Sequence, residues 1–205
     1  KPIFDFEETP NYYDISRVVN YAFALKAKET FNDQERLRLL RDRALILTLA
    51  DSGLEVGLAC RLRICDIDRK SNRLWIVNEG IKTSVHVTPK VLETIFEYLS
   101  ARQDIDKSFS RSSAFLPVFA QHRAGQKGQV LALSSRSVGL IVSKRASEAL
   151  GAEHDGTVSP KSFRHYAVAS LLQPLTALHP KIVKRSKSYF ENGQYDDAIF
   201  NAMKA

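Results

Sequence analysis

The chain has 205 residues, of which 44% are hydrophobic and 26% are charged. This length is enough for one substantial core or two small ones, and the composition is ordinary for a soluble globular protein. No apolar run is long enough to predict a membrane span, and the acidic opening KPIFDFEETP does not resemble a signal peptide.

The net charge of +7 is unevenly distributed. Residues 1–30 hold four basic and five acidic groups, whereas residues 181–188 hold four basic groups and no acid. Residues 121–150 hold five Lys or Arg against Glu148 alone. Basic patches of this kind suit a polyanion such as DNA or RNA. The alternative is a solvated surface that only keeps the protein soluble.

The two cysteines, Cys60 and Cys65, do not form a CxxC motif, and no cluster of histidines accompanies them. The sequence therefore predicts neither a metal site nor a cofactor. Reduced thiols fit a cytoplasmic protein, or a nuclear one if the source is eukaryotic.

The first half of the chain predicts three helices and a hairpin. Apolar residues recur at helical spacing over residues 16–29, and Asp14 is the expected N-cap. The next helix, residues 34–50, becomes apolar all round, which indicates burial, and Gly53 suits a left-handed end. Residues 54–62 predict a short third helix. NRLWIV, a turn at Asn78-Glu79-Gly80, and TSVHVT then predict a β-hairpin.

The second half predicts further helices. Pro89 precedes a helix over VLETIFEYLSAR, and residues 103–133 are expected to be mostly loop. A helix is expected over residues 135–150, another over KSFRHYAVASLL that Pro174 breaks, and a last one at about residues 196–202. The order predicts one domain, mainly α with a small antiparallel β-sheet.

Several motifs follow one another in a recognisable order: the buried helix with its SGL turn, LRICDID, the hairpin with its lysine, VTPKVLETIFEYL, and VSPKSFRHYAVASLL. Each is weak alone, but together, over about residues 10–190, they resemble the catalytic domain of tyrosine recombinases, the phage integrase family. By this resemblance residues 1–10 are a linker and residues 11–205 the integrase-like catalytic domain. The family's N-terminal core-binding domain is expected to be absent from this chain.

The resemblance implies an enzyme of DNA recombination or DNA integration, as in mobile elements, that needs no metal. A tyrosine hydroxyl attacks a backbone phosphate and stays attached as a 3′-phosphotyrosine, which a 5′-hydroxyl then displaces. Charge builds on the phosphoryl oxygens in the transition state, so arginine forks suit that position. A lysine can protonate the departing 5′-oxygen.

The catalytic roles carry over to named positions. Lys82 matches the general-acid lysine, Lys161 a position where the family has His or Lys, and Arg164 the second arginine. The ungapped match of LHPKIVKRSKSY to the family's ending makes Tyr189 the nucleophile candidate, with His179 near the third motif. Three of them have a simpler alternative: an exposed turn lysine for Lys82, a helix-surface arginine for Arg164, and a groove anchor beside Phe190 for Tyr189.

Two neighbouring residues have lesser expected roles. His165 is expected to be a packing residue rather than a catalyst. Tyr195 is the reserve nucleophile.

The sequence departs from the family pattern in three places. Glu55 stands where the family has its first catalytic arginine, and Leu58 where it usually keeps an acid. Pro180 stands where it has His or Trp, one residue from His179. Arg164 and His179 are 179 − 164 = 15 residues apart, where the family normally fits another helix. We therefore expect impaired cleavage.

Double-stranded DNA is the expected partner, and no membrane is. The family assembles as a tetramer on DNA, and DAIFNAM at residues 197–203 is apolar enough to be a docking segment. The residues expected to contact DNA are basic: Arg123, Lys127, Arg136, Lys144, Arg145, Lys184 and Arg185.

Three functions stay open from the sequence. The first is an active site-specific recombinase. The second is a catalytically inactive DNA-binding module with the same fold. The third is a protein–protein interaction domain that shares only the architecture, because fold does not fix function.

Overall fold

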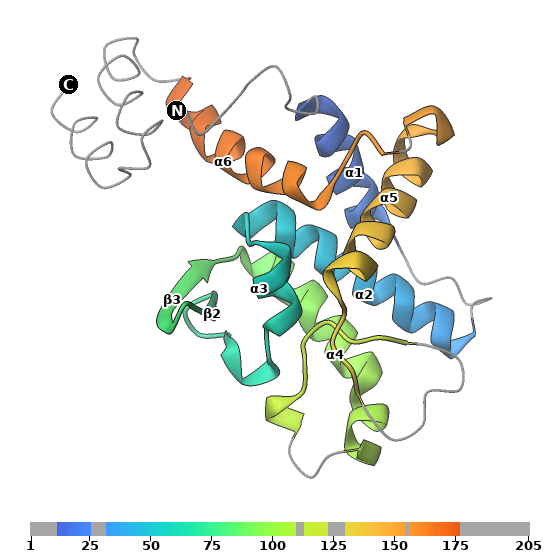
Figure 1. The fold of residues 1–205 in the computed structure, drawn as a ribbon, viewed down its shortest axis with the longest axis vertical. Helices are drawn as coiled ribbons and strands as arrows, with labels where there is room; N and C mark the ends of the chain where they lie inside the picture. The colour runs from blue at the N-terminus through green and yellow to red at the C-terminus, as the bar shows by residue number, and fades with distance from the viewer. Residues whose placement is uncertain (1–11, 26–31, 110–112, 123–129, 155, 177–205) are drawn as a thin grey trace, which may run out of the picture.

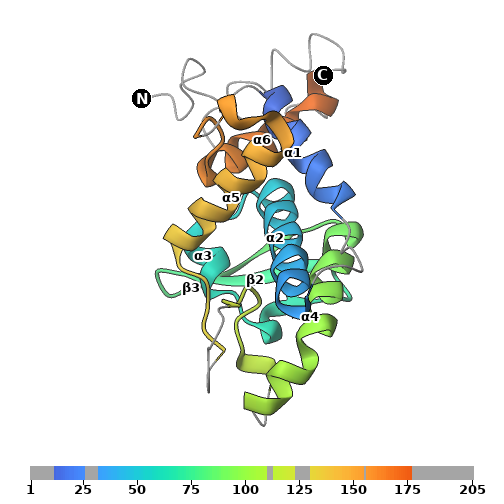
Figure 2. The same cartoon turned by 90° about the vertical axis from the view of Figure 1, so that its right-hand side faces the viewer.

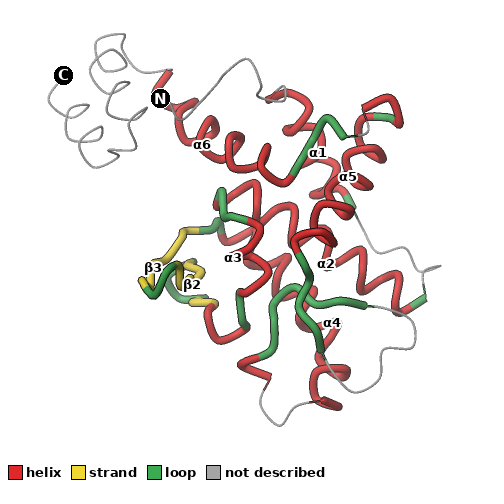
Figure 3. Tube along the Cα trace, viewed as in Figure 1, coloured by secondary structure: helices red, strands yellow, loops and turns green. Residues whose placement is uncertain are grey.

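The computed structural model describes residues 12–25, 32–109, 113–122, 130–154 and 156–176. In this part the chain is mainly helical, with a small sheet at one side (Figures 1 and 3). The α-helices are α1 (Tyr12–Ala24), α2 (Asp33–Ser52), α3 (Val56–Arg61), α4 (Pro89–Phe109), α5 (Ser135–Leu150) and α6 (Pro160–Thr176). Three 3₁₀ turns, η1 (Ile64–Asp66), η2 (Ser113–Phe115) and η3 (Ala152–His154), lie in the connections. No helix in the described ranges is long and apolar enough to cross a membrane.

Helix α2 is the centre of the packing, as its apolar composition predicts. It contacts α1, α4 and α6, and α1 also contacts α5 and α6 (Figures 1 and 2). From Ala44 to Ala50 its side chains are at most 5% exposed. A helix buried on all sides must satisfy its few polar groups internally, and Thr48 does so by donating to the Ala44 carbonyl at 2.7 Å.

The sheet is antiparallel and has the order β1-β2-β3, formed by β1 (Ile67–Asp68), β2 (Arg73–Asn78) and β3 (Ile81–His86). Asn78 pairs with Ile81, so the turn has two residues, Glu79 and Gly80, rather than the predicted three. Both have positive φ, 50° and 81°, which is the requirement of a type I′ hairpin turn. The predicted hairpin is confirmed with this tighter turn.

Three predicted boundaries were wrong, and a further prediction falls outside the described residues. Helix α1 begins at Tyr12 rather than residue 16, so Asp14 lies in its first turn and is not its N-cap. Helix α4 continues into the predicted loop as far as Phe109. Helix α6 passes Pro174 and ends at Thr176, two residues later, so the proline lies in the last turn instead of ending the helix at its own position. The predicted last helix, at residues 196–202, lies outside the described residues.

The extension of α4 has a tertiary cause. Arg102 is fully buried, pairs with Asp106 one turn later at 2.9 Å, and donates to the carbonyls of Pro117 and Val118. A buried guanidinium needs all of these partners. The contacts therefore fix the last turns of α4 against a segment that follows it, which helix propensity alone does not reveal.

A buried histidine lies beside this arginine. The Tyr98 hydroxyl lies 2.8 Å from His122 Nε2 and also accepts from Arg102 and the Ala120 N–H, so the hydroxyl donates to an unprotonated Nε2. Burial first, and then the positive charges of Arg41, Arg102 and Arg38, lower the pKa of His122 from 6.5 to about 3. The folded protein holds this imidazole neutral.

The pKa of His122 predicts how stability depends on pH. Because the folded pKa lies below the unfolded value, the contribution is complete above pH 6.5 and is lost as pH falls toward 3. We expect the wild type to lose about 2–3 kcal/mol more than His122→Gln between pH 7 and pH 4.5, measured by urea unfolding. Equal losses in the two proteins would contradict a neutral buried histidine.

Gly53 ends α2 with φ 63°, as predicted, and its N–H bonds the Leu49 carbonyl at 3.0 Å. A Cβ at Gly53 would lie 3.2 Å from the Cβ of Ala167 in α6. Because it adds left-handed strain and a tight contact, Gly53→Ala is expected to cost about 1–2 kcal/mol.

The matched control is Gly139→Ala in α5, where an added Cβ would meet nothing within 4 Å. There the same change should stabilise by about 0.5–1 kcal/mol, because alanine is the better helix former. Urea unfolding of both variants measures the two effects. A neutral or stabilising Gly53→Ala would show that the turn does not need glycine.

Candidate functional site

The turn at the end of α2 joins three elements. Asp51 accepts a hydrogen bond from the Thr88 N–H at 2.5 Å, and Thr88 in turn caps α4 through its carbonyl. Gly53 packs against α6 at Ala167, and Glu55 is the N-cap residue of α3. Residues 51–55 thus fix the end of the hairpin, the start of α4, and α6 relative to one another.

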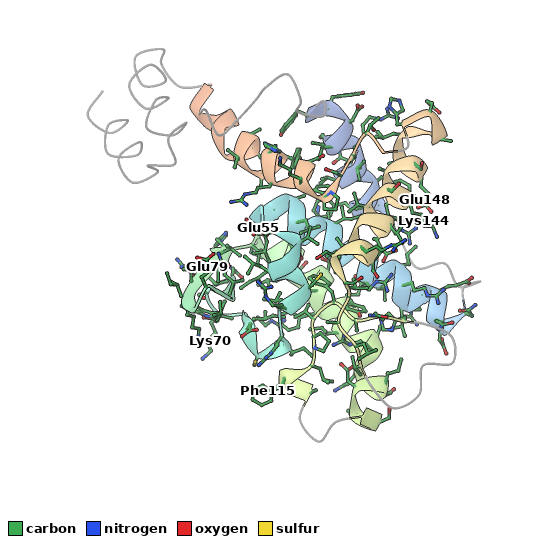
Figure 4. The ribbon with its side chains drawn as sticks, viewed as in Figure 1. Glu55, Lys70, Glu79, Phe115, Lys144 and Glu148 are labelled. Carbon is green, nitrogen blue, oxygen red and sulfur yellow. The ribbon has the colours of Figure 1, made fainter. Side chains whose placement is uncertain are left out.

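Glu55 and Arg164 form an ion pair across this turn. The Glu55 Oε1 atom accepts from Arg164 Nη1 at 2.5 Å, although the residues are 109 positions apart. Each side chain is 56% exposed, so the pair lies at the surface. Glu55 makes no side-chain bond to the end of its own helix. Figure 4 shows Glu55 at the end of α3 that faces α6. The carboxylate therefore serves Arg164 rather than α3.

Helix α6 presents its cations to solvent. Phe163 and Ala167 are buried against α2, whereas Lys161 and Arg164 are exposed. Positions three apart share one face of a helix, so these two cations are neighbours. The half-buried His165 has its pKa lowered by burial first, and then by Lys161 and Arg164.

Lys82 is exposed on the outer face of the hairpin. It pairs with Val77 in the sheet register, and its Nζ lies 5.0 Å from the centre of the Trp75 ring. Directly opposed residues share a face, so Lys82 and Trp75 stand on the side away from the buried Leu74. The ammonium is held against an aromatic ring by a cation–π contact.

The structure brings some of the predicted site residues together. Glu55 contacts Arg164, and Lys161 shares the helix face of Arg164. Lys82 stands on a separate element whose base is tied to the same turn through Asp51. His179 and Tyr189, like Pro180 and Tyr195, lie outside the described residues.

The residues predicted to contact DNA fall into three groups: exposed, buried, and outside the described residues. Arg136 and Lys144 are exposed on α5. Arg145 is instead 7% exposed, and its guanidinium lies 2.7 Å from Asp42 and 2.8 Å from Glu148. Arg123, Lys127, Lys184 and Arg185 lie outside the described residues.

The Asp42 carboxylate receives two arginines, because Arg41 also contacts it at 2.6 Å. Asp42 lies on α2 and Arg145 on α5, so this buried group joins the two helices. The two arginines are balanced by two carboxylates, those of the buried Asp42 and of Glu148 at the surface. A structural role therefore accounts for Arg145, and we leave it out of the candidate DNA surface.

Sequence reasoning missed three contacts: Asp51 with Thr88, Asp42 with Arg145, and Glu55 with Arg164. The sequence held one signal for the contact between Asp51 and Thr88. An acid in the last turn of a helix opposes the helix dipole, and Asp51 becomes favourable only beside the start of another helix. Among the described residues, no group of three or more His, Cys, Asp or Glu side chains is placed to hold a metal ion.

Comparison with known sequences gives the family. The profile of the phage integrase family matches residues 25–178, which is most of the chain. The chain belongs to the phage integrase family of tyrosine recombinases. Tyrosine recombinase XerC of Pelobacter propionicus is 30% identical over 146 residues, which is 71% of this chain and 43% of the relative.

A second relative gives the same picture. XerC of Thermodesulfovibrio yellowstonii is 29% identical over 140 residues, 68% of this chain and 44% of the relative. The chain thus spans less than half the length of these two recombinases.

Solved structures agree on the fold. The crystal structure of XerA recombinase matches with a TM-score of 0.56 at 18% identity, over 79% of this chain and 49% of that one. The XerH site-specific recombinase, in a post-cleavage complex with a palindromic difH substrate, matches with a TM-score of 0.58 at 18% identity. The match covers 82% of this chain and 43% of that one. The expected integrase-like fold is confirmed.

The two neighbouring cations of α5 provide a matched test of burial. Arg145→Ala is expected to cost about 2–3 kcal/mol, because it strips Asp42 and Glu148 of a buried partner. Lys144→Ala should cost less than about 0.5 kcal/mol, because Lys144 makes only an exposed contact with Glu148 at 4.0 Å. Urea unfolding measures both, and similar costs would remove the structural role given to Arg145.

Proposed function

We propose that this chain is a DNA-binding, site-specific recombinase-type domain, whose chemistry would run through a 3′-phosphotyrosine at Tyr189. The observation that carries the proposal is the exposed Arg164, which lies beside the Gly53 turn of a phage integrase fold. Its guanidinium already binds one anionic group, the Glu55 carboxylate. Lys161 on the same face adds a second cation. An exposed pair of cations on a rigid helix suits a phosphate.

The proposed roles follow from charge and reach. Arg164 and Lys161 would hold the non-bridging oxygens, where charge builds as the Tyr189 oxygen attacks phosphorus and the bond to the 5′-oxygen breaks. Lys82 would give its proton to that departing oxygen, and to do so it must leave the Trp75 ring. His179 is proposed to assist at the phosphate.

The surface around the site is proposed to hold the duplex. Arg136 and Lys144 stand on the exposed side of α5, and Arg123, Lys127, Lys184 and Arg185 are proposed to add further phosphate contacts. Such contacts make affinity fall steeply with salt. Assembly of several copies on the duplex belongs to the same proposal.

Glu55 is proposed to make cleavage slow. A unit charge about 4 Å from a phosphate is worth roughly 4 kcal/mol at an effective dielectric near 20. A carboxylate in place of an arginine loses an attraction of that order and adds a repulsion. Because each 1.36 kcal/mol is about tenfold in rate, cleavage should fall by several orders of magnitude.

A second function is favoured by the same ion pair: a DNA-binding module that does not cleave. In that case Arg164 would contribute to phosphate binding, and no reaction would follow. The contact between Glu55 and Arg164 supports this alternative, because it engages the one arginine that matches the family's catalytic set.

Trapping a covalent adduct tests the proposal. Purified protein is mixed with a pool of nicked duplexes and run on a denaturing gel beside Tyr189→Phe. A faint adduct that Tyr189→Phe abolishes and Glu55→Arg increases at least about tenfold is the expected result. If the protein binds duplex in a salt-sensitive way but no variant forms an adduct, the non-cleaving DNA-binding module is the correct function and the recombinase is not. Absence of duplex binding would overturn both.

A further inference from the structure

We propose that Glu55 is an internal substitute for a DNA phosphate, a carboxylate that fills the anion site of Arg164 until duplex DNA displaces it. This inference rests on the proposed function, because it assumes that Arg164 binds the DNA backbone. The inference adds that Glu55 occupies the anion site of Arg164 in the absence of DNA. A DNA phosphate can then contact Arg164 only if the Glu55–Arg164 ion pair breaks.

The geometry of Glu55 supports this role. At a helix N-cap, the short polar side chains of Ser, Thr, Asp and Asn commonly accept from the first N–H groups of their own helix, and the longer glutamate is not among them. Glu55 has the extended backbone of an N-cap, φ −64° and ψ 140°, yet makes no such bond. Its carboxylate accepts from Nη1 of Arg164. The Glu55 carboxylate therefore makes its contact across the turn and does not cap its own helix.

The chemistry of the two anions is alike. A guanidinium donates to the oxygens of a carboxylate and of a phosphate with the same planar fork. A phosphodiester oxygen and Glu55 Oε1 would thus compete for the same donor. Lys161 lies beside it on α6 and would attract whichever anion is bound.

The exposure of the pair makes displacement feasible. Both side chains are 56% exposed, and exposed ion pairs are weak and are screened by salt. The backbone beneath them is fixed by Gly53 against Ala167. Glu55 can leave Arg164 by rotating its side chain, with no movement of the helices.

The experiment compares the loss of two glutamates, each removed from the wild type and from Arg164→Gln. Glu55→Gln removes the competing charge, and Glu79→Gln removes one exposed charge from the hairpin turn, so both variants gain the same net charge. Figure 4 shows the two glutamates on α3 and on the hairpin. Both changes are made in the wild type and in Arg164→Gln, and thermal unfolding confirms that each protein is folded. Affinity for a labelled duplex is measured by anisotropy at about 0.1 M salt, where surface charges still interact.

Glu55→Gln is expected to tighten duplex binding about fivefold, and Glu79→Gln by less than about twofold. In the Arg164→Gln background the gain from Glu55→Gln should shrink to that of Glu79→Gln, because no anion site remains to be freed. Equal gains from the two glutamates, or a gain that survives the loss of Arg164, would overturn the proposal. If Arg164→Gln changes duplex affinity neither in the wild type nor in Glu55→Gln, the proposed role of Arg164 fails as well. If no variant binds duplex, the proposed function itself is overturned.

Discussion

The left-handed turn at Gly53 is the constraint on which the arrangement of this domain depends. It ends the buried α2 and brings α6 within contact of the backbone, since a Cβ there would lie 3.2 Å from Ala167. Asp51, on one side of the turn, holds the end of the hairpin strand through Thr88, and Glu55, on the other, reaches Arg164. One short turn thus sets the positions of the elements that carry Lys82, Lys161 and Arg164.

The arginines of this chain serve two purposes that burial separates. Arg41, Arg102 and Arg145 are at most 7% exposed and are matched by Asp42, Asp106 and backbone carbonyls. They join α2, α4, α5 and the segment after α4 into one frame. Arg164 is exposed and paired only at the surface, which leaves its guanidinium free to exchange partners. Net positive charge alone cannot make this distinction, because it counts both kinds equally.

Local sequence signals predicted the elements well and their tertiary partners poorly. Helix α5 runs from Ser135 to Leu150 as its periodicity indicates, and Gly53 has the predicted left-handed conformation. The continuation of α4 to Phe109 was missed because its cause, Arg102 on the carbonyls of Pro117 and Val118, is not local. Glu55 was expected to repel a phosphate. That it would bind Arg164 could not be predicted, since the two are 109 positions apart. Arg145 was assigned to a DNA surface because composition does not report burial.

These observations support one view of the site. In this proposal, Arg164 on a phage integrase scaffold would bind a DNA phosphate, and the Glu55 carboxylate is its partner in the structure. The most direct measurement is a crystal structure of the protein with a bound duplex. The account predicts the Arg164 guanidinium about 2.8 Å from a backbone phosphate oxygen, with the Glu55 carboxylate turned away. A duplex bound elsewhere, with Glu55 still on Arg164, would contradict it.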